Sequence, residues 1–171
     1  NLGLAIASTR KIESQNIKNA LSHNPHLKIK LPGRIQQINN GKYFKLISPQ
    51  NELFLDGSHN EDAAFQLNLA MQNMPQVKDL VMIIGMINTK DPINYVKQLK
   101  GLVAIKTITI PDEVSAIPAE QLSSKLTGLV SEVSQANSIE EAIRSLSNEY
   151  PQARILICGS LYLAGQVLKY N

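Results

Sequence analysis

The chain has 171 residues, 43% of them hydrophobic and 18% charged, which fits one folded domain with a short appendage and excludes a disordered or low-complexity chain. No apolar run approaches the roughly 18 residues that cross a bilayer, the start lacks a secretory signal, and the single cysteine cannot form an internal disulfide, so we expect a cytoplasmic protein without a membrane partner. The net charge is +3, but residues 1–50 hold eight basic residues and one acidic residue. Because Trp is absent and aromatic residues are few, this basic segment favours phosphate or inter-domain contact over nucleic acid.

The first fifty residues predict two short helices followed by a hairpin. Residues 2–12 match the end of a helix, and a second helix begins at Ser14. Residues 34–38 and 43–47 predict two strands, because Asn40-Gly41 between them is a typical two-residue turn in which both positions need positive φ. The hairpin would supply one antiparallel strand.

From residue 52 onward, strands and helices alternate. The predicted strands are 52–56, 80–86, 102–110, 129–133 and 154–158, and the predicted helices are 61–74, 92–100, 118–127, one that begins with the capping box Ser138–Glu141, and 160–169. Strands separated by helices of this length predict an α/β fold with a right-handed, doubly wound and mostly parallel sheet.

Polar residues follow the first of these strands. Ligands in an open α/β sheet gather at the carboxyl ends of the strands. Asp56 ends the strand, Gly57 permits a tight turn, and His59 adds a titratable ring at the same place. Two interpretations stay open: Asp56 and Asn60 are turn and cap residues alone, or the segment is a ligand site.

Two further strand ends carry similar alternatives. Gly159-Ser160 after the last strand could hold an anion at a helix start, or could be a helix cap beside a buried Cys158. Lys90-Asp91 after the central strand could contact a ligand, or could be a solvated loop.

Arg34 is the basic residue best suited to an anion. Pro32 and Gly33 restrict the backbone before it, and its guanidinium offers a planar fork; the alternative is an ordinary surface charge. The chain contains neither a P-loop motif nor G-x-G-x-x-G. His23 and His26 lack a spaced carboxylate or Cys, so we expect no metal site in this chain.

Four segments taken together resemble a known family. They are Leu31-Pro32-Gly33-Arg34, Asp56-Gly57-Ser58-His59-Asn60, Lys90-Asp91 and Gly159-Ser160-Leu161-Tyr162. In this order they are similar to the carboxyl-terminal part of folylpolyglutamate synthase / dihydrofolate synthase, in the Mur ligase superfamily. The resemblance implies that residues 1–30 are the terminal helices of a preceding ATPase domain. Residues 31–171 would form the Mur ligase C-terminal domain, with a Rossmann-like mixed sheet.

The resemblance also implies an activity. An ATP-dependent ligase of this kind activates the carboxylate of a folate or dihydropteroate as an acyl phosphate, which the amine of L-glutamate attacks. By motif match, Asn1, Arg34 and Asp56 would contact ATP, and His59 and Ser160 would line the cleft for the incoming amino acid. The magnesium ligands would lie in the preceding ATPase domain, which is the expected partner of this one. We expect a monomer, and no activity from this chain alone.

The sequence departs from the usual pattern of the family at three positions. Leu31 stands where Trp is frequent, Ser58 where Ala is frequent, and Glu61 where Pro is frequent. The chain also lacks the Tyr-Ala pair that usually precedes His-Asn in the Mur peptidoglycan ligases. Two alternatives remain beside the folate ligase: a Mur-type peptidoglycan-precursor ligase domain, and a non-catalytic doubly wound binding domain.

Overall fold

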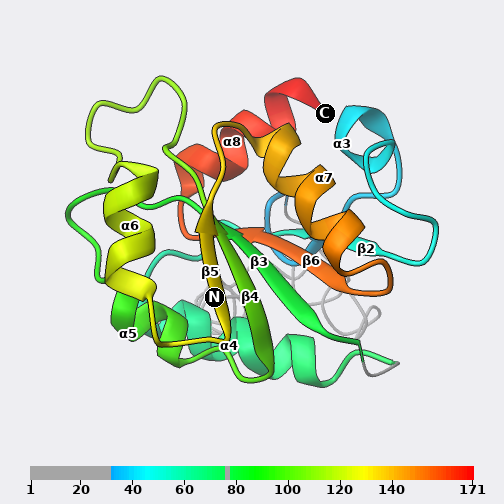
Figure 1. The fold of residues 1–171 in the computed structure, drawn as a ribbon, viewed down its shortest axis with the longest axis horizontal. Coiled ribbons are helices and arrows are strands. Elements are labelled where there is room, and N and C mark those ends of the chain that lie inside the picture. Colours follow the sequence, from blue (N-terminus) through cyan, green and yellow to red (C-terminus); the bar gives the residue numbers. More distant parts are fainter. Residues whose placement is uncertain (1–31, 76–77) are drawn as a thin grey trace, which may run out of the picture. The chain divides into compact units, whose positions relative to one another are not determined.

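The computed structural model describes residues 32–75 and 78–171, which form a six-stranded mixed sheet flanked by helices (Figure 1). Asn1 and both helices predicted before residue 31 lie outside the described residues. The strands are β1 (Gln36–Gln37), β2 (Glu52–Leu55), β3 (Leu80–Ile84), β4 (Leu102–Thr107), β5 (Glu132–Gln135) and β6 (Arg154–Cys158). The helices are α3 (Gly41–Phe44), α4 (Glu61–Gln72), α5 (Pro92–Lys97), α6 (Ala119–Leu126), α7 (Ile139–Glu149) and α8 (Leu161–Tyr170).

The sheet has the strand order β1-β2-β6-β3-β4-β5. In this six-stranded sheet the β1–β2 pair is antiparallel, and the other four pairs are parallel. The chain places β2, β3, β4 and β5 first and then returns over the sheet, so that β6 enters between β2 and β3. This is the doubly wound, mostly parallel sheet with one antiparallel strand that the sequence predicts.

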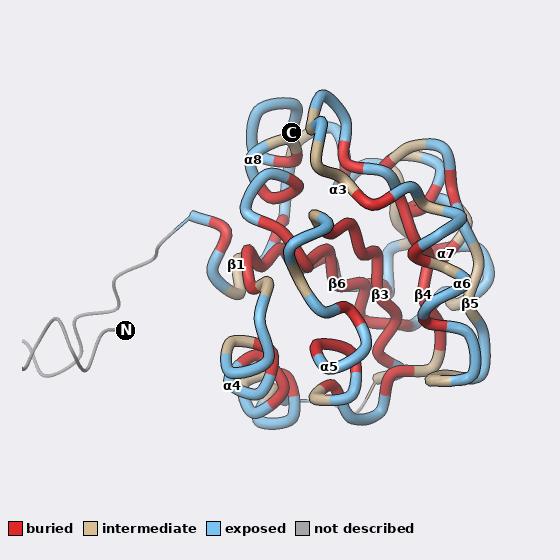
Figure 2. The backbone as a smooth tube through the Cα atoms, turned by 90° about the vertical axis from the view of Figure 1, so that its left-hand side faces the viewer, coloured by how far each residue is buried: buried red, intermediate tan, exposed pale blue. Residues whose placement is uncertain are grey.

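Two apolar layers cover the sheet, one on each face. The side chains of β2 alternate between them, with Leu53 and Leu55 on one face and Phe54 on the other. Helices α4, α5 and α6 pack on the face of Phe54, and α3, α7 and α8 pack on the opposite face (Figure 1). Strands β3 and β6 are buried along their whole length (Figure 2), which explains their continuous apolar runs.

The predicted hairpin at residues 34–47 is wrong. Gly41 has the positive φ that the turn motif requires, at +86°, but it begins the one-turn helix α3 instead of a second strand. Tyr43 is buried in the core, and its backbone N–H donates to Asn171 Oδ1 at 3.1 Å. The antiparallel partner of β1 is β2, with Gln36 opposite Leu55. A contact with the last residue of the chain is invisible to a local turn pattern.

Side chains cap four of the helices where the sequence places polar residues. Asn60, Asp91, Ser138 and Ser160 accept hydrogen bonds from backbone N–H groups at the starts of α4, α5, α7 and α8. Among residues 32–75 and 78–171, no helix combines the length and apolar character that a bilayer crossing requires.

Candidate functional site

Three strand ends meet at one edge of the sheet. Strand β6 pairs in parallel with β2 on one side and with β3 on the other, so their carboxyl ends open in the same direction. The segments 56–60, 85–91 and 159–160 follow these ends, and we name them together the carboxyl-edge cluster. Backbone bonds join them: Gly159 N donates to Ser58 O at 3.0 Å, and Gly85 N donates to Cys158 O at 3.4 Å. The segments 56–60 and 85–91 thus lie on either side of the segment 159–160.

The turn that carries Arg34 is fixed against this cluster. Gly57 N donates to Gly33 O at 2.7 Å, and Ile35 N donates to Asp56 Oδ2 at 2.8 Å. Gly33 has φ +66°, a left-handed conformation that favours glycine, and its N–H donates to Gln36 Oε1 at 2.8 Å. Arg34 lies between these bonded residues and is exposed. Its backbone is therefore positioned while its guanidinium is open to solvent.

Asp56 organises two loops from a buried position. Its side chain is almost fully buried, and besides Ile35 N its carboxylate accepts Ser58 N, on Oδ1 at 2.7 Å. The bond to Ile35 also holds that β-branched residue at φ +44°, where it is strained. The turn-residue interpretation of Asp56 is therefore observed. A carboxylate oxygen has two lone pairs, so each oxygen keeps acceptor capacity beyond its backbone bond.

His59 is half-buried and follows Asp56 in the same turn. Its Nδ1 lies 3.1 Å from Gly57 O. A carbonyl oxygen can only accept, so Nδ1 carries the proton in the neutral ring, and the lone pair is on Nε2. The ring can therefore accept a hydrogen bond from a ligand or, when protonated, donate one.

The Cys158–Ser160 strand end is a helix cap beside a buried thiol. Ser160 is buried, and its Oγ accepts a hydrogen bond from Tyr162 N at 3.0 Å. Burial raises the pKa of the Cys158 thiol to about 12, so the group is neutral near pH 7 and is not a nucleophile. The hydroxyl proton of Ser160 remains available for a further bond.

The Lys90-Asp91 strand end also has a local structural role. The carboxylate of Asp91 accepts from Ile93 N at 3.0 Å and from Asn94 N at 3.1 Å, which caps α5. Glu61, at the start of α4, is exposed and accepts from Gln98 Nε2 at 3.0 Å, so it ties α4 to α5.

Tyr95 is a residue of the cluster's surroundings that the sequence did not indicate, and it contacts the cluster from α5. This residue of α5 is fully buried, and its hydroxyl lies 2.7 Å from Ser58 Oγ. Burial and, secondarily, the neighbouring Cys158 raise the pKa of Tyr95, so the phenol is neutral. A partner 37 residues away gives no local sequence signal, although the hydroxyl of a buried tyrosine usually has a hydrogen-bond partner.

The basic side chains at this edge suit an anion better than a metal ion. An exposed guanidinium and a half-buried imidazole are present there. Within the described ranges, no three His, Cys, Asp or Glu side chains gather as ligands for a cation.

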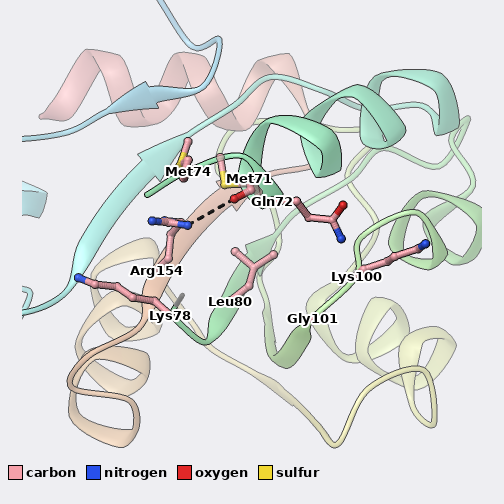
Figure 3. Close-up of a pocket in the computed structure, with 8 residues that line it drawn as sticks. All are labelled: Met71, Gln72, Met74, Lys78, Leu80, Lys100, Gly101 and Arg154. Atoms are coloured by element: carbon pink, nitrogen blue, oxygen red, sulfur yellow. Dashed lines mark hydrogen bonds between the residues drawn. The ribbon is translucent and has the colours of Figure 1, made fainter. Parts of the chain in front are cut away.

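A hollow of about 330 Å³ lies at the opposite edge, where β3 and β6 begin. Its lining includes Lys78, Lys100 and Arg154 (Figure 3). The two lysine side chains point away from each other in Figure 3, and Arg154 points toward Met71 O. The cations of this hollow do not converge on one point, so it is a poor anion site.

Comparisons with known proteins agree with the fold and with the family that the sequence resembles. A family profile described as "Dihydrofolate synthetase, C-terminal domain" matches residues 39–170. Among solved structures, the bifunctional folylpolyglutamate synthase/dihydrofolate synthase from Yersinia pestis CO92 is 24% identical, with a TM-score of 0.69 over 97% of this chain and 36% of its own. E. coli FolC in complex with ADP is 23% identical, with a TM-score of 0.72 over 97% of this chain and 37% of its own.

A third similar structure is Mycobacterium tuberculosis folylpolyglutamate synthase complexed with ADP and AMPPCP. It is 18% identical, with a TM-score of 0.69 over 83% of this chain and 32% of its own. At these identities, the likeness shows a common fold. The chain spans little more than a third of the length of the first two structures. No curated protein matches the chain.

Proposed function

Because this chain belongs to the dihydrofolate synthetase C-terminal domain family, we propose that it is part of an ATP-dependent ligase that adds L-glutamate to the carboxylate of a folate or of dihydropteroate. Similar proteins support the ligands: one structure is a complex with ADP, and another has Mn, AMPPNP and L-glutamate bound. When bound, ATP supplies the phosphoryl group that activates the substrate carboxylate as an acyl phosphate, which the amine of L-glutamate then displaces.

The proposed protein has a further domain. The chain covers 36% of the length of a similar bifunctional enzyme. The rest of that length is enough for an ATPase domain, which we place before residue 31 in the full-length protein. We assign residues 1–30 to the end of that domain and residues 31–171 to the ligase domain. From the family resemblance, we place the magnesium ligands in the ATPase domain.

Within this domain, the proposed contacts divide between nucleotide and amino acid. Arg34 is the cation for the phosphates or ribose, and Asp56 combines its backbone bonds with acceptance from a ribose hydroxyl. Asn1, by motif alone, is the third nucleotide contact. His59, through Nε2, faces the incoming glutamate from the same turn as Asp56, and Ser160, through its hydroxyl proton, faces it from the neighbouring strand end.

The observation that carries this proposal is the fixed turn beneath Arg34. Because the Asp56 turn holds the backbone on both sides of Arg34, binding an anion requires ordering of the arginine side chain but not of the loop that carries it. Closure of this domain over ATP bound to the ATPase domain would bring that charge onto the nucleotide.

The test uses the full-length protein with an Arg34→Ala substitution. We expect kcat/KM for ATP to fall by roughly 10²-fold, the scale of losing a positioned charged contact. Lys45→Ala, which removes another exposed cation of the basic segment, is the matched control and should leave ATP use unchanged. Unaltered ATP kinetics in both Arg34→Ala and Asp56→Ala would refute the assignment.

The substrate is tested separately from the nucleotide. Full-length protein should incorporate L-glutamate into dihydropteroate or tetrahydrofolate, measured as ADP release that depends on both substrates. Activity with a UDP-sugar acid in their place would assign the protein to the peptidoglycan-type ligases instead.

A further inference from the structure

Ser58 is the residue through which three parts of the carboxyl-edge cluster are joined. Its N–H donates to Asp56 Oδ1 at 2.7 Å, and its carbonyl accepts from Gly159 N at 3.0 Å. Its hydroxyl lies 2.7 Å from the hydroxyl of Tyr95 on α5. The backbone of Ser58 thus connects β2 with β6, and its side chain connects both with the helix that follows β3.

Asp56 depends on this arrangement for its orientation. One carboxylate oxygen is held by Ser58 N, and the other holds Ile35 N, next to Arg34. A shift of the Ser58 backbone therefore moves the carboxylate, and through it the turn that presents the guanidinium. The chain of contacts runs from Tyr95 through Ser58 and Asp56 to Ile35 without a gap.

Tyr95 can hold Ser58 because both groups are excluded from water. Ser58 is 1% exposed and Tyr95 is fully buried, in the apolar layer formed with α4 and Cys158. In such a place a hydroxyl without a partner is costly, so loss of the phenol oxygen would displace Ser58, including its backbone, toward another partner. A phenylalanine would fill nearly the same volume, so only the hydrogen bond would change.

We propose that Tyr95 is a positioning residue for the nucleotide site, acting through Ser58 to keep Asp56 and the Arg34 turn in the orientation that binds ATP. This inference rests on the proposed function. It differs from a general packing role because it assigns the effect to one hydroxyl group and to one ligand.

The experiment measures steady-state kinetics of the full-length protein with a Tyr95→Phe substitution. We expect KM for ATP to rise about 10-fold, since small displacements of positioned groups weaken binding and rate, while kcat stays within about two-fold. The double variant Ser58→Ala/Tyr95→Phe should recover most of the KM for ATP, because removing both partners leaves no buried hydroxyl unpaired. Recovery by a second truncation is a result that lost packing could not give.

Two controls make the outcome decisive. Tyr43→Phe makes the same change in a tyrosine buried on the other face of the sheet and should not alter the KM for ATP. Ser58→Ala alone removes the same bond from its other side, so it should raise the KM for ATP even if Tyr95→Phe folds poorly. Urea unfolding of each variant separates a loss of folded protein from a loss of ATP affinity.

An unchanged KM for ATP in both Tyr95→Phe and Ser58→Ala would overturn the inference, as would a double variant as impaired as Tyr95→Phe. If Arg34→Ala weakens ATP use while these variants do not, the proposed function stands and only the inference fails. If Arg34→Ala has no effect, the proposed function itself fails.

Discussion

The two edges of the sheet both gather charged groups, but they use them in different ways. At the amino edge, Arg154 Nε donates to Glu52 Oε2 at 2.8 Å, and its other nitrogens donate to Met71 O and Pro75 O. At the carboxyl edge, Asp56 accepts two backbone N–H groups, and Arg34 forms no ion pair in the part of the chain that the structure describes. At the amino edge, the buried arginine is bonded to groups within the fold. At the carboxyl edge, the guanidinium of Arg34 is exposed on a turn whose backbone is fixed.

The contrast shows how to separate a structural charge from a ligand-binding one. The burial of a charged side chain and the number of its partners within the fold indicate which role it has. Its residue type and the size of the nearest hollow do not. The hollow at the amino edge contains three cations, yet its arginine is satisfied and its lysines diverge (Figure 3). A change at the amino edge should therefore alter folding, and the loss of Arg34 should alter ligand use.

The largest expected effect is at the amino edge, for Arg154→Ala. The guanidinium is buried, packs over the ring of Phe54 and donates to the carbonyls near the end of α4. Its loss leaves Glu52 without its shortest ion pair, so we expect the free energy of unfolding to fall by about 3 kcal/mol, measured by urea unfolding. Lys100→Ala, in the same hollow but exposed, should change it by less than about 0.5 kcal/mol. Equal losses in both variants would break the comparison.

The next effect is a steric one at the carboxyl edge, for Gly159→Ala. Gly159 has φ +102°, and an added Cβ would lie 2.7 Å from Ile84 Cγ1 and 3.0 Å from Gly85 O. Backbone strain and overpacking together should lower the free energy of unfolding by about 2–3 kcal/mol. Gly57→Ala is the matched control. Its Cβ would meet the tip of the exposed Leu161 side chain, which can move, so the free energy of unfolding, measured by thermal unfolding of both variants, should fall by less than in Gly159→Ala.

The alternation of strands and helices could be predicted because its cause is local. Apolar runs such as residues 80–84 and caps such as Ser138 are visible within a few positions, and the structure confirms both. The hairpin at 34–47 failed because the environment of Tyr43 is set by Asn171, at the other end of the chain. Turn chemistry alone could not reveal that contact.

The strand-end residues could likewise be found, but not what each side chain does there. The sequence places Asp56 and Ser160 at strand ends, and the sheet brings those ends together. It leaves open whether Asp56 and Ser160 are turn and cap residues, which the structure shows, and it does not reveal that Tyr95 contacts Ser58. The contact between Ser58 and Tyr95 joins segments that are 37 residues apart, so it depends on the order of strands in the sheet.

A matched pair of helix caps sharpens the assignment of Ser160. Ser138 Oγ accepts Glu141 N at 3.1 Å at the start of α7, as Ser160 Oγ accepts Tyr162 N at 3.0 Å at the start of α8. Either serine changed to alanine should lower the free energy of unfolding by about 1 kcal/mol. In the full-length protein, only Ser160→Ala should also raise the KM for L-glutamate. An equal effect of both variants on that KM would reduce Ser160 to a cap.

The smallest effect concerns an ion pair that lies in water, and it calibrates the buried one at Arg154. Lys42 of α3 pairs with Glu140 in the first turn of α7, and both side chains are substantially exposed. The hydrogen bond from Lys42 lowers the pKa of Glu140 below its ordinary 4.5. A lowered carboxyl pKa means that the pair stabilises the fold above about pH 4.5 and that this contribution disappears as the pH falls through the lower, folded value.

Lys42→Met should therefore cost no more than about 0.5 kcal/mol at pH 7, because water screens the pair, and the difference from the parent should vanish once the pH is below the lowered pKa of Glu140. Urea unfolding of the parent and of Lys42→Met, from pH 7 down to acidic pH, gives the difference in their free energies of unfolding at each pH. Arg154→Ala should keep a cost at low pH, because the bonds of the guanidinium to the carbonyls of Met71 and Pro75 do not titrate. If the loss in free energy of unfolding vanished at low pH for Arg154→Ala as it does for Lys42→Met, Arg154 would stabilise the fold only through its ion pair with Glu52. Its bonds to the two carbonyls would then contribute nothing, and the distinction between the two edges would depend on one titratable group.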